Sequence, residues 1–259
     1  MIAFASSLIN WSYAWANRGA LLHGLLVAVE VSALSLVLSV SVGLLLAVMR
    51  MSRPPFTWLA AIYINIFRGV PVIVTALWVY FGVSEVSGLN FSVFVAAVIS
   101  LTLLYSAFIS EIFRSALEAV QRGQREAGLA LGMTRPRIFV SVILPQATKI
   151  ALPNIGSMLI GMVKDTSVMF VIGLTELVAT VQNLASVSYE YFTLYTAAAV
   201  IYIAVAFTVD FAFRTIEKTM QTPPRGGIAR AAKGRRRRHV QAIMDRFDAS
   251  WQQQGTSAP

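Results

Sequence analysis

The stretch EIFRSALEAVQRGQREAGLALGMTRPRIFVSVILPQATKIALPNIG, residues 111–156, interrupts a chain that is otherwise mostly apolar. No charged residue lies in the segment before it, Phe91–Ser110, and a second apolar run begins at Ile155. The stretch itself contains six basic residues: Arg114, Arg122, Arg125, Arg135, Arg137 and Lys149. A polar segment of this length between two membrane-length runs faces one aqueous side, and its excess of Lys and Arg predicts that this side is the cytoplasm.

The inner part of this stretch, QREAGLALG at residues 124–132, predicts a helix of about two turns. Gly132 suits the left-handed position just past a helix end. The spacing of Ala127, Gly128 and Leu131 places small residues on one face. Such a helix suits docking into a groove of another protein, and it equally suits packing on its own chain. The residues alone leave both interpretations open.

The composition indicates a membrane protein. Of the 259 residues, 57% are hydrophobic and 13% are charged, and the mean hydropathy is +0.69. A soluble domain carries about a quarter charged residues. The net charge of +9 comes largely from the region after Phe213, which holds ten Lys and Arg against three Asp and Glu. It is therefore a property of the tail and predicts no nucleic-acid partner.

The sequence lacks the residues that most catalytic mechanisms need. The chain has no cysteine, and its two histidines, His23 and His239, lie near opposite ends. Thiol nucleophiles, disulfides and a protein-ligated zinc are excluded or disfavoured on that basis. The phosphate-loop pattern G-x-x-x-x-G-K-[ST] is also absent, so ATP would have to be used by another chain. The sequence predicts no catalytic residues, no metal, no cofactor and no enzyme activity.

Apolar runs of about 20 residues are long enough to cross a bilayer. Five are predicted: Leu21–Met49, Trp58–Val83, Phe91–Ser110, Ile155–Leu177 and Phe192–Phe213. Residues 1–19, which contain tryptophans, are predicted to lie at the interface. The loops and tail on one side hold eighteen Lys and Arg, and the other side holds only Arg18. This bias predicts an external N-terminus and a cytoplasmic C-terminus.

Charged residues inside apolar spans are costly and often functional. There are five: Glu30, Arg68, Lys164, Asp165 and Asp210. Asp210 is predicted to pair with Arg214 one turn later. Arg68 is predicted to reach the cytoplasmic interface or to brace the loop helix. Glu30 faces either a partner subunit or the cavity.

Lys164 and Asp165 fall near the middle of the fourth predicted span and precede Thr166 and Ser167. Adjacent helical residues point about 100° apart and need separate partners. One interpretation is a polar patch on a translocation path. The other is an ion pair between helices, with Arg68 or Glu30 as a partner.

Two further patterns carry open alternatives. The spacing Ser157-x-x-x-Gly161 allows two helix backbones to approach closely, either within one chain or between subunits. In the tail, residues 221–259, the run Arg235–Arg238 precedes apolar residues at helical spacing. This predicts either an anchor on anionic lipid or a disordered, solubilising segment.

The pattern E-A-G-x-x-x-G, followed after nine residues by V-I-L-P, resembles the EAA loop of ABC-importer permeases. The matching positions are Glu126, Ala127, Gly128, Gly132, Val142, Leu144 and Pro145. Gly128 stands where the family has Ala, and Val142 where it has Ile. The segments YINIFRGVPVI at 63–73 and VKDTSVMFVIGLTEL at 163–177 resemble the polar-amino-acid branch, and the resemblance covers roughly residues 20–220.

The resemblance implies an all-α, MetI-like type I permease of five transmembrane helices. It implies an outer segment at 1–19, a membrane domain at 20–220 with a cytoplasmic coupling loop at 111–153, and a basic tail at 221–259. The implied partners are a pair of cytoplasmic ABC ATPases, a second permease subunit, a periplasmic solute-binding protein and the bacterial inner membrane. The implied function is uptake of a polar amino acid. The alternative is a self-sufficient secondary transporter or channel.

Overall fold

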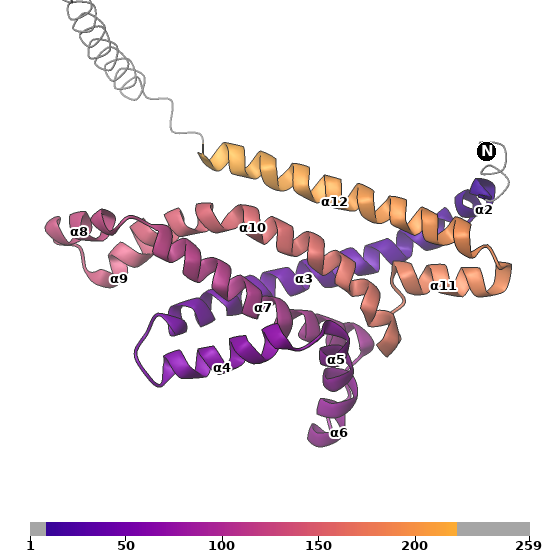
Figure 1. Cartoon of the computed structure of the whole chain (residues 1–259), viewed down its shortest axis with the longest axis horizontal. Helices are drawn as coiled ribbons and strands as arrows, with labels where there is room; N and C mark the ends of the chain where they lie inside the picture. The colour runs from indigo at the N-terminus through magenta and orange to yellow at the C-terminus, as the bar shows by residue number, and fades with distance from the viewer. Residues whose placement is uncertain (1–8, 222–259) are drawn as a thin grey trace, which may run out of the picture. The chain divides into compact units, whose positions relative to one another are not determined.

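Helices make up the regular structure of residues 9–221, which are the part that the computed structural model describes. The basic tail and residues 1–8 lie outside this part. Within it, four helical stretches are long and apolar enough to cross a membrane (Figure 1): Arg18–Arg50, Val93–Ala119, Arg135–Ile172 and Tyr191–Thr219. The chain is therefore a multi-pass membrane protein with an all-helical fold.

The predicted second span is bent. Helix α4 covers Phe56–Gly69, and the following helical run, Val72–Ser87, leaves it at 110°. That run consists of α5 (Val72–Leu77), a π-helical segment η1 (Trp78–Val83) and α6 (Ser84–Ser87). Pro71 causes the bend, because the residue before a proline is driven into extended backbone, and Val70 has ψ 132°. The predicted second span is therefore not one continuous helix, and residues 9–221 have five spans only if this bent pair counts as one.

Helix α7 (Val93–Ala119) lies at the centre of the packing and runs beside α3 (Arg18–Arg50). The two helices approach closely because small residues line their contact. A Cβ on Gly43 would lie 3.0 Å from the Ser106 carbonyl oxygen. The hydroxyls of Ser35 and Ser39 donate across the contact to α7 carbonyl oxygens at 3.4 Å. Close backbone approach and hydroxyl bonds of this kind hold membrane helices together where the hydrophobic effect does not.

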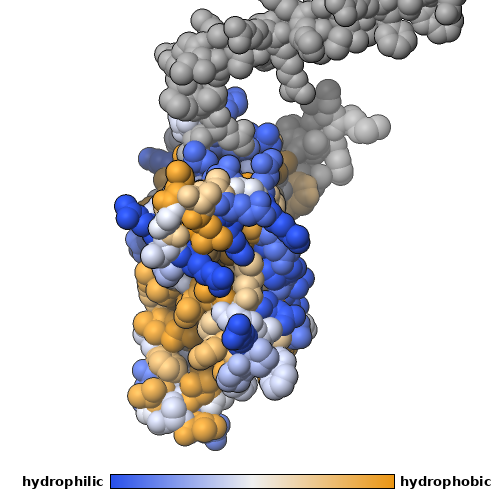
Figure 2. All heavy atoms as spheres, turned by 90° about the vertical axis from the view of Figure 1, so that its left-hand side faces the viewer, coloured by the Kyte–Doolittle hydropathy of each residue, from blue (hydrophilic) through white to orange (hydrophobic). Residues whose placement is uncertain are grey.

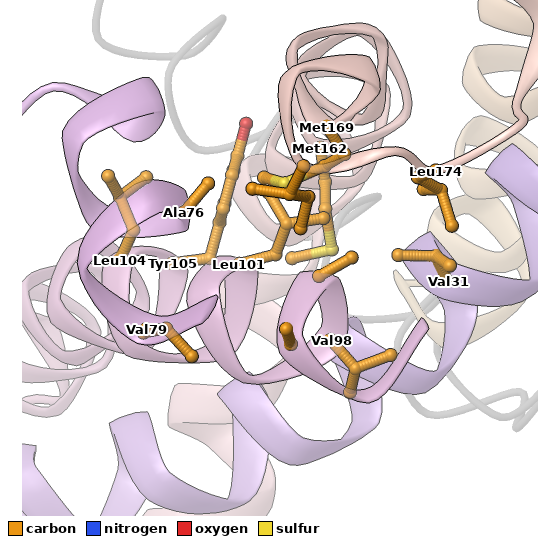
Figure 3. Packing of buried hydrophobic residues seen from close by; sticks show 13 residues of the cluster. Val31, Ala76, Val79, Val98, Leu101, Leu104, Tyr105, Met162, Met169 and Leu174 are labelled. Carbon is orange, nitrogen blue, oxygen red and sulfur yellow. The ribbon is translucent and has the colours of Figure 1, made fainter. Parts of the chain in front are cut away.

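The main apolar cluster joins α3, α5, η1, α7, α10 (Leu144–Asp165) and the 3-10 segment that follows α10 (Figure 3). Leu101 of α7 is fully buried at its centre, next to Met162 and Met169. Tyr105 belongs to this cluster through its ring, and its hydroxyl points out of the cluster. The cluster therefore fixes a polar group at a defined place among hydrocarbon side chains.

The predicted fourth span is longer and begins earlier than expected. Helix α9 (Arg135–Ile138), π-helical η2 (Phe139–Ile143), α10 (Leu144–Asp165) and the 3-10 segment η3 (Thr166–Ile172) follow one another without a break. Gly173 ends the run in the left-handed region at φ +93°.

Three prolines lie in this helical run. Pro136 lies in the first turn of α9, where the missing N–H has no helical partner to lose. Pro145 follows η2 inside the continuous run and Pro153 lies inside α10, and neither ends the helix. Prolines are tolerated inside membrane helices because neighbouring groups satisfy the freed backbone atoms.

At the other end of the bundle, α11 (Leu177–Ser188) packs against α3. Its N-cap is Glu176, which is fully buried and accepts hydrogen bonds from the N–H groups of Val178 and Ala179. The Tyr202 hydroxyl of α12 (Tyr191–Gln221) donates to the same carboxylate at 3.0 Å. Glu176 therefore links the start of α11 to α12.

Candidate functional site

The predicted cytoplasmic helix is α8, which spans Arg122–Ala130. Gly128 is its single buried residue, and every other residue of α8 is exposed. Glu126 forms no ion pair with any residue in 9–221, and Ala127 is open to solvent. Helix α8 thus stands on the end of the bundle and is not enclosed by it (Figure 1).

Gly128 is the residue through which α8 packs closely against the rest of its own chain. A Cβ at this position would lie 2.7 Å from Ile138 Cγ1, and Ile138 is buried in α9. Gly128 therefore does not contribute to an outward small-residue face. It explains the departure from the E-A-A pattern, because an alanine methyl would overlap Ile138.

Gly132 ends α8 with a left-handed turn at φ +74°. The N–H of Met133 donates to the Gly128 carbonyl oxygen at 3.0 Å, and the N–H of Gly132 donates to Leu129 at 2.9 Å. These two bonds define a Schellman motif. The prediction that Gly132 lies just past the helix is confirmed.

Apolar side chains are left uncovered at this turn. Leu131 is 80% exposed and Leu129 is 46% exposed. Figure 2 views this end of the molecule, where hydrophobic and strongly hydrophilic side chains lie next to one another. The remaining loop positions, Leu144 and Pro145, start α10, which carries the chain away from α8 into the membrane.

A groove on α7 and α10 contains two neighbouring cavities that share Phe108 and Met158. The first has a volume of about 300 Å³ and includes Tyr105, Gly161 and Asp165 in its lining. The second has a volume of about 350 Å³, and its polar lining residues are Arg68, Glu111, Ser115 and Asn154. Together they form a partly polar groove along helices that are long and apolar enough to cross a membrane.

Asp165 is half-buried at the end of α10 and accepts a hydrogen bond from the Tyr105 hydroxyl at 2.9 Å. Gly161, one turn earlier, leaves room for this contact, since a Cβ there would lie 3.0 Å from the same hydroxyl. The Ser157-x-x-x-Gly161 spacing therefore serves packing within the chain at Gly161. Ser157 itself is exposed.

Arg68 lies next to the last residue of α4 and forms no ion pair with an acidic residue within 9–221. Its guanidinium carbon lies 5.6 Å from the centre of the Phe108 ring, a cation–π arrangement. Glu111 lines the same cavity and pairs with Arg114 at 2.8 Å, and Arg114 also pairs with Glu118 at 2.9 Å. Arg68 is thus a cation whose N–H donors are available to a bound anion.

The other predicted path residues lie in different environments. Lys164 is exposed and lines neither of the two cavities. Thr166 is fully buried, and its hydroxyl donates to the Val163 carbonyl oxygen at 2.7 Å. Ser167 is half-buried. The structure thus brings only Asp165 of these four residues into the groove.

Neither of the expected ion pairs with Lys164 or Asp165 forms within residues 9–221. Glu30 is exposed on α3, about 18 Å along the helix from Arg18 at 1.5 Å per residue. The predicted pair of Asp210 with Arg214 is confirmed at 2.6 Å.

Sequence reasoning missed the aromatic and amide residues of the groove. Tyr105 and Phe108 lie on the third predicted span, in a segment that reads as ordinary apolar helix, and Asn154 lies near the end of the polar stretch, one residue before the predicted fourth span. Tyr105, a tyrosine in the middle of a span, could have indicated a polar contact, because a buried phenol needs a hydrogen-bond partner.

Comparison with known proteins places this fold and groove in a family. The family described as "Binding-protein-dependent transport system inner membrane component" matches residues 39–222. The chain is 30% identical over 203 residues to the arginine transport system permease protein ArtQ of Bacillus subtilis, which covers 78% of this chain and 93% of that protein. It is 32% identical over 217 residues to the glutamine transport system permease protein GlnP of Escherichia coli K12, covering 82% and 98%.

Solved structures agree. The structure titled as an amino acid ABC transporter with histidines superposes with a TM-score of 0.75 at 32% identity, covering 82% of this chain and 99% of that one. A chain of the MetNI methionine ABC transporter superposes with a TM-score of 0.68 at 21% identity, covering 80% and 98%, which shows the same fold.

The chain belongs to the family of inner-membrane components of binding-protein-dependent transport systems. It is a permease subunit of an ABC importer, as the EAA-like loop implied, and the alternative of a self-sufficient transporter is set aside.

Proposed function

We propose that this subunit carries a polar amino acid across the bacterial inner membrane, powered by separate cytoplasmic ATPases. The permease would work with a second permease subunit and an external solute-binding protein. The names of the relatives ArtQ and GlnP support an amino acid as substrate. The observation that carries the proposal is the exposure of α8, in which Gly128 is the one buried residue.

In the proposed orientation, the N-terminus is external, the C-terminus is cytoplasmic, and the bent pair α4 and α5–α6 counts as the second of five spans. The excess of Lys and Arg on the α8 side supports this arrangement. Helix α8 would then face the compartment that holds ATP. Glu126, Ala127 and Leu131 would enter a groove of an ATPase, and Gly132 would hold the end of the helix in shape.

The groove would be the part of the path that contacts substrate. An amino acid carries an ammonium and a carboxylate on the same carbon. Asp165 supplies an anionic partner beside Tyr105, and Arg68 supplies a cation in the adjoining cavity. We assign the ammonium to Asp165 and the carboxylate to Arg68. Lys164, Thr166 and Ser167 would shape or support the path rather than line the cavities.

The proposal is tested with Glu126→Lys, which reverses a charge on the exposed face of α8. The matched control is Glu85→Lys, the same reversal on the exposed helix α6. The transporter is purified with its partners and reconstituted with its binding protein. Glu126→Lys is expected to lose co-purifying ATPase and ATP-dependent amino acid uptake, and Glu85→Lys to keep both. Retention of ATPase and uptake in Glu126→Lys would contradict the docking role.

A further inference from the structure

A second, larger groove lies at the opposite end of the chain from α8. It has a volume of about 730 Å³ and is enclosed by α2 (Trp11–Ala16), the first turns of α3 and one face of α12. Its lining is apolar on α3 and α12, with Leu21, Leu22, Val200 and Ile201 among the residues. Figure 1 shows α2 beside the start of α12.

Helix α2 is fixed in place by hydrogen bonds at both of its ends. Before it, the backbone N–H of Asn10 donates to Thr193 Oγ1 at 3.0 Å, and Asn10 Nδ2 donates to Glu190 Oε1 at 3.2 Å. After it, Asn17 Nδ2 donates to the Tyr13 carbonyl oxygen at 2.9 Å, and α3 begins at the next residue. The groove is thus held open by contacts outside its lining.

The rim of the groove carries a cation and two indoles. The Arg18 guanidinium carbon lies 4.9 Å from the centre of the Trp15 ring, and Nη1 donates to the Trp15 carbonyl oxygen at 3.0 Å. An arginine has five N–H donors. The remaining donors of Arg18 have no partner in residues 9–221. Trp11 and Trp15 are both more than half exposed, and tryptophans concentrate at the level of lipid headgroups.

We propose that this groove binds one phospholipid of the surrounding bilayer, with an acyl chain against α3 and α12 and the phosphate on Arg18. The apolar lining matches a hydrocarbon chain. Guanidinium groups bind phosphate through paired charge-assisted hydrogen bonds, which matches the orientation of Arg18 at the rim. The groove lies where two membrane-spanning helices reach the interface, which is the depth at which a phospholipid presents these two parts together.

The test uses the full transporter in phosphatidylethanolamine vesicles that contain phosphatidylglycerol with a diazirine in one acyl chain. After irradiation, labelled peptides are identified by mass spectrometry. Labels are expected on the segments containing Leu21 and Val200. Val200→Trp fills the groove and should remove most of this labelling. The control Ile203→Trp adds the same ring at an exposed α12 position outside the lining and should leave the labelling unchanged.

A second variant tests the headgroup contact by removing the charge of Arg18. Arg18→Gln should weaken lipid retention during detergent washing about tenfold, which is the ratio that corresponds to 1.4 kcal/mol and to the loss of one charge-assisted hydrogen bond. Repeating the experiment with the diazirine on phosphatidylethanolamine should also label the groove, because both lipids carry the phosphate. Even labelling along α12 that ignores Val200→Trp, or cross-links from this groove to a second protein chain, would overturn the proposal.

Discussion

Gly128 of α8 and Ile138 of α9 lie so close together that a Cβ at residue 128 would overlap the Ile138 side chain. A Cβ would lie 2.7 Å from Ile138 Cγ1 and 2.9 Å from Cδ1. This contact holds the exposed helix on the bundle. It involves the one residue of α8 that is buried.

Gly128→Ala is expected to lower the stability of the purified transporter by about 1–3 kcal/mol, the usual cost of overpacking. Because the cost arises at Ile138, the double variant Gly128→Ala/Ile138→Ala should be more stable than the sum of the single effects predicts. Thermal unfolding of all four proteins measures this coupling. Gly123→Ala is the control, since nothing lies within 4 Å of a Cβ there. Additive effects would show that the contact does not limit α8.

Tyr105→Phe removes the hydroxyl that donates to Asp165 at 2.9 Å. Loss of a hydrogen bond to a charged group costs about 1.5–3 kcal/mol, so ATP-dependent uptake should fall at least about tenfold. The control is Tyr63→Phe, whose hydroxyl bonds to Ser106 at 2.8 Å and lines neither cavity. Uptake assays in proteoliposomes compare the two. Equal losses would assign Tyr105 a purely structural role.

Leu131→Asp places a charge on an apolar side chain that is 80% exposed at the end of α8. Surface substitutions change stability by about 0.5 kcal/mol or less, so the thermal midpoint should not move. ATPase co-purification should nevertheless be lost, because an apolar docking contact becomes charged. Val187→Asp changes an equally exposed residue on α11 and should keep the ATPase. A matching loss in both variants would argue against docking at Leu131.

Gly24→Ala probes the contact of α3 with the start of α11. A Cβ there would meet Thr180 Oγ1 at 2.7 Å and the Glu176 backbone at 3.0 Å. Backbone atoms cannot rotate away, so the variant should lose about 1–3 kcal/mol. Adding Thr180→Ala to Gly24→Ala should not restore the lost stability. Gly19→Ala, with nothing within 4 Å, should be neutral in thermal unfolding. If Thr180→Ala fully restored the stability of Gly24→Ala, the overlap with the Thr180 hydroxyl alone would account for the loss.

Local features of the fold could be predicted because their causes are local. Gly132 ends α8 through its own left-handed backbone, and Asp210 meets Arg214 one turn away. Pro71 also acts locally, because it holds Val70 in extended backbone at the bend between α4 and α5. Pro153 lies inside α10 without ending it, and prolines are tolerated in membrane helices where neighbouring groups satisfy the freed backbone atoms.

The groove could not be predicted in the same way. Tyr105 and Asp165 are 60 positions apart in the sequence and meet only because α7 and α10 pack side by side. Nothing in the run K-D-T-S distinguishes Asp165, which lines a cavity, from Lys164, which does not. Which of two adjacent residues faces a cavity is decided by the rotation of the helix, and tertiary packing sets that rotation.

The residue that contacts Gly128 of α8 and a residue that lines the groove lie on the same helix. Ile138 and Asp165 lie on the same uninterrupted helical run, Arg135–Ile172, about 40 Å apart at 1.5 Å per residue. A displacement of α8 would therefore be transmitted to the groove along one continuous helix instead of through a loop. This run is least regular at its π-helical segment, its 3-10 segment and Pro153, so it should bend most easily there. Substitutions at these places should change the coupling between α8 and the groove before they change substrate affinity.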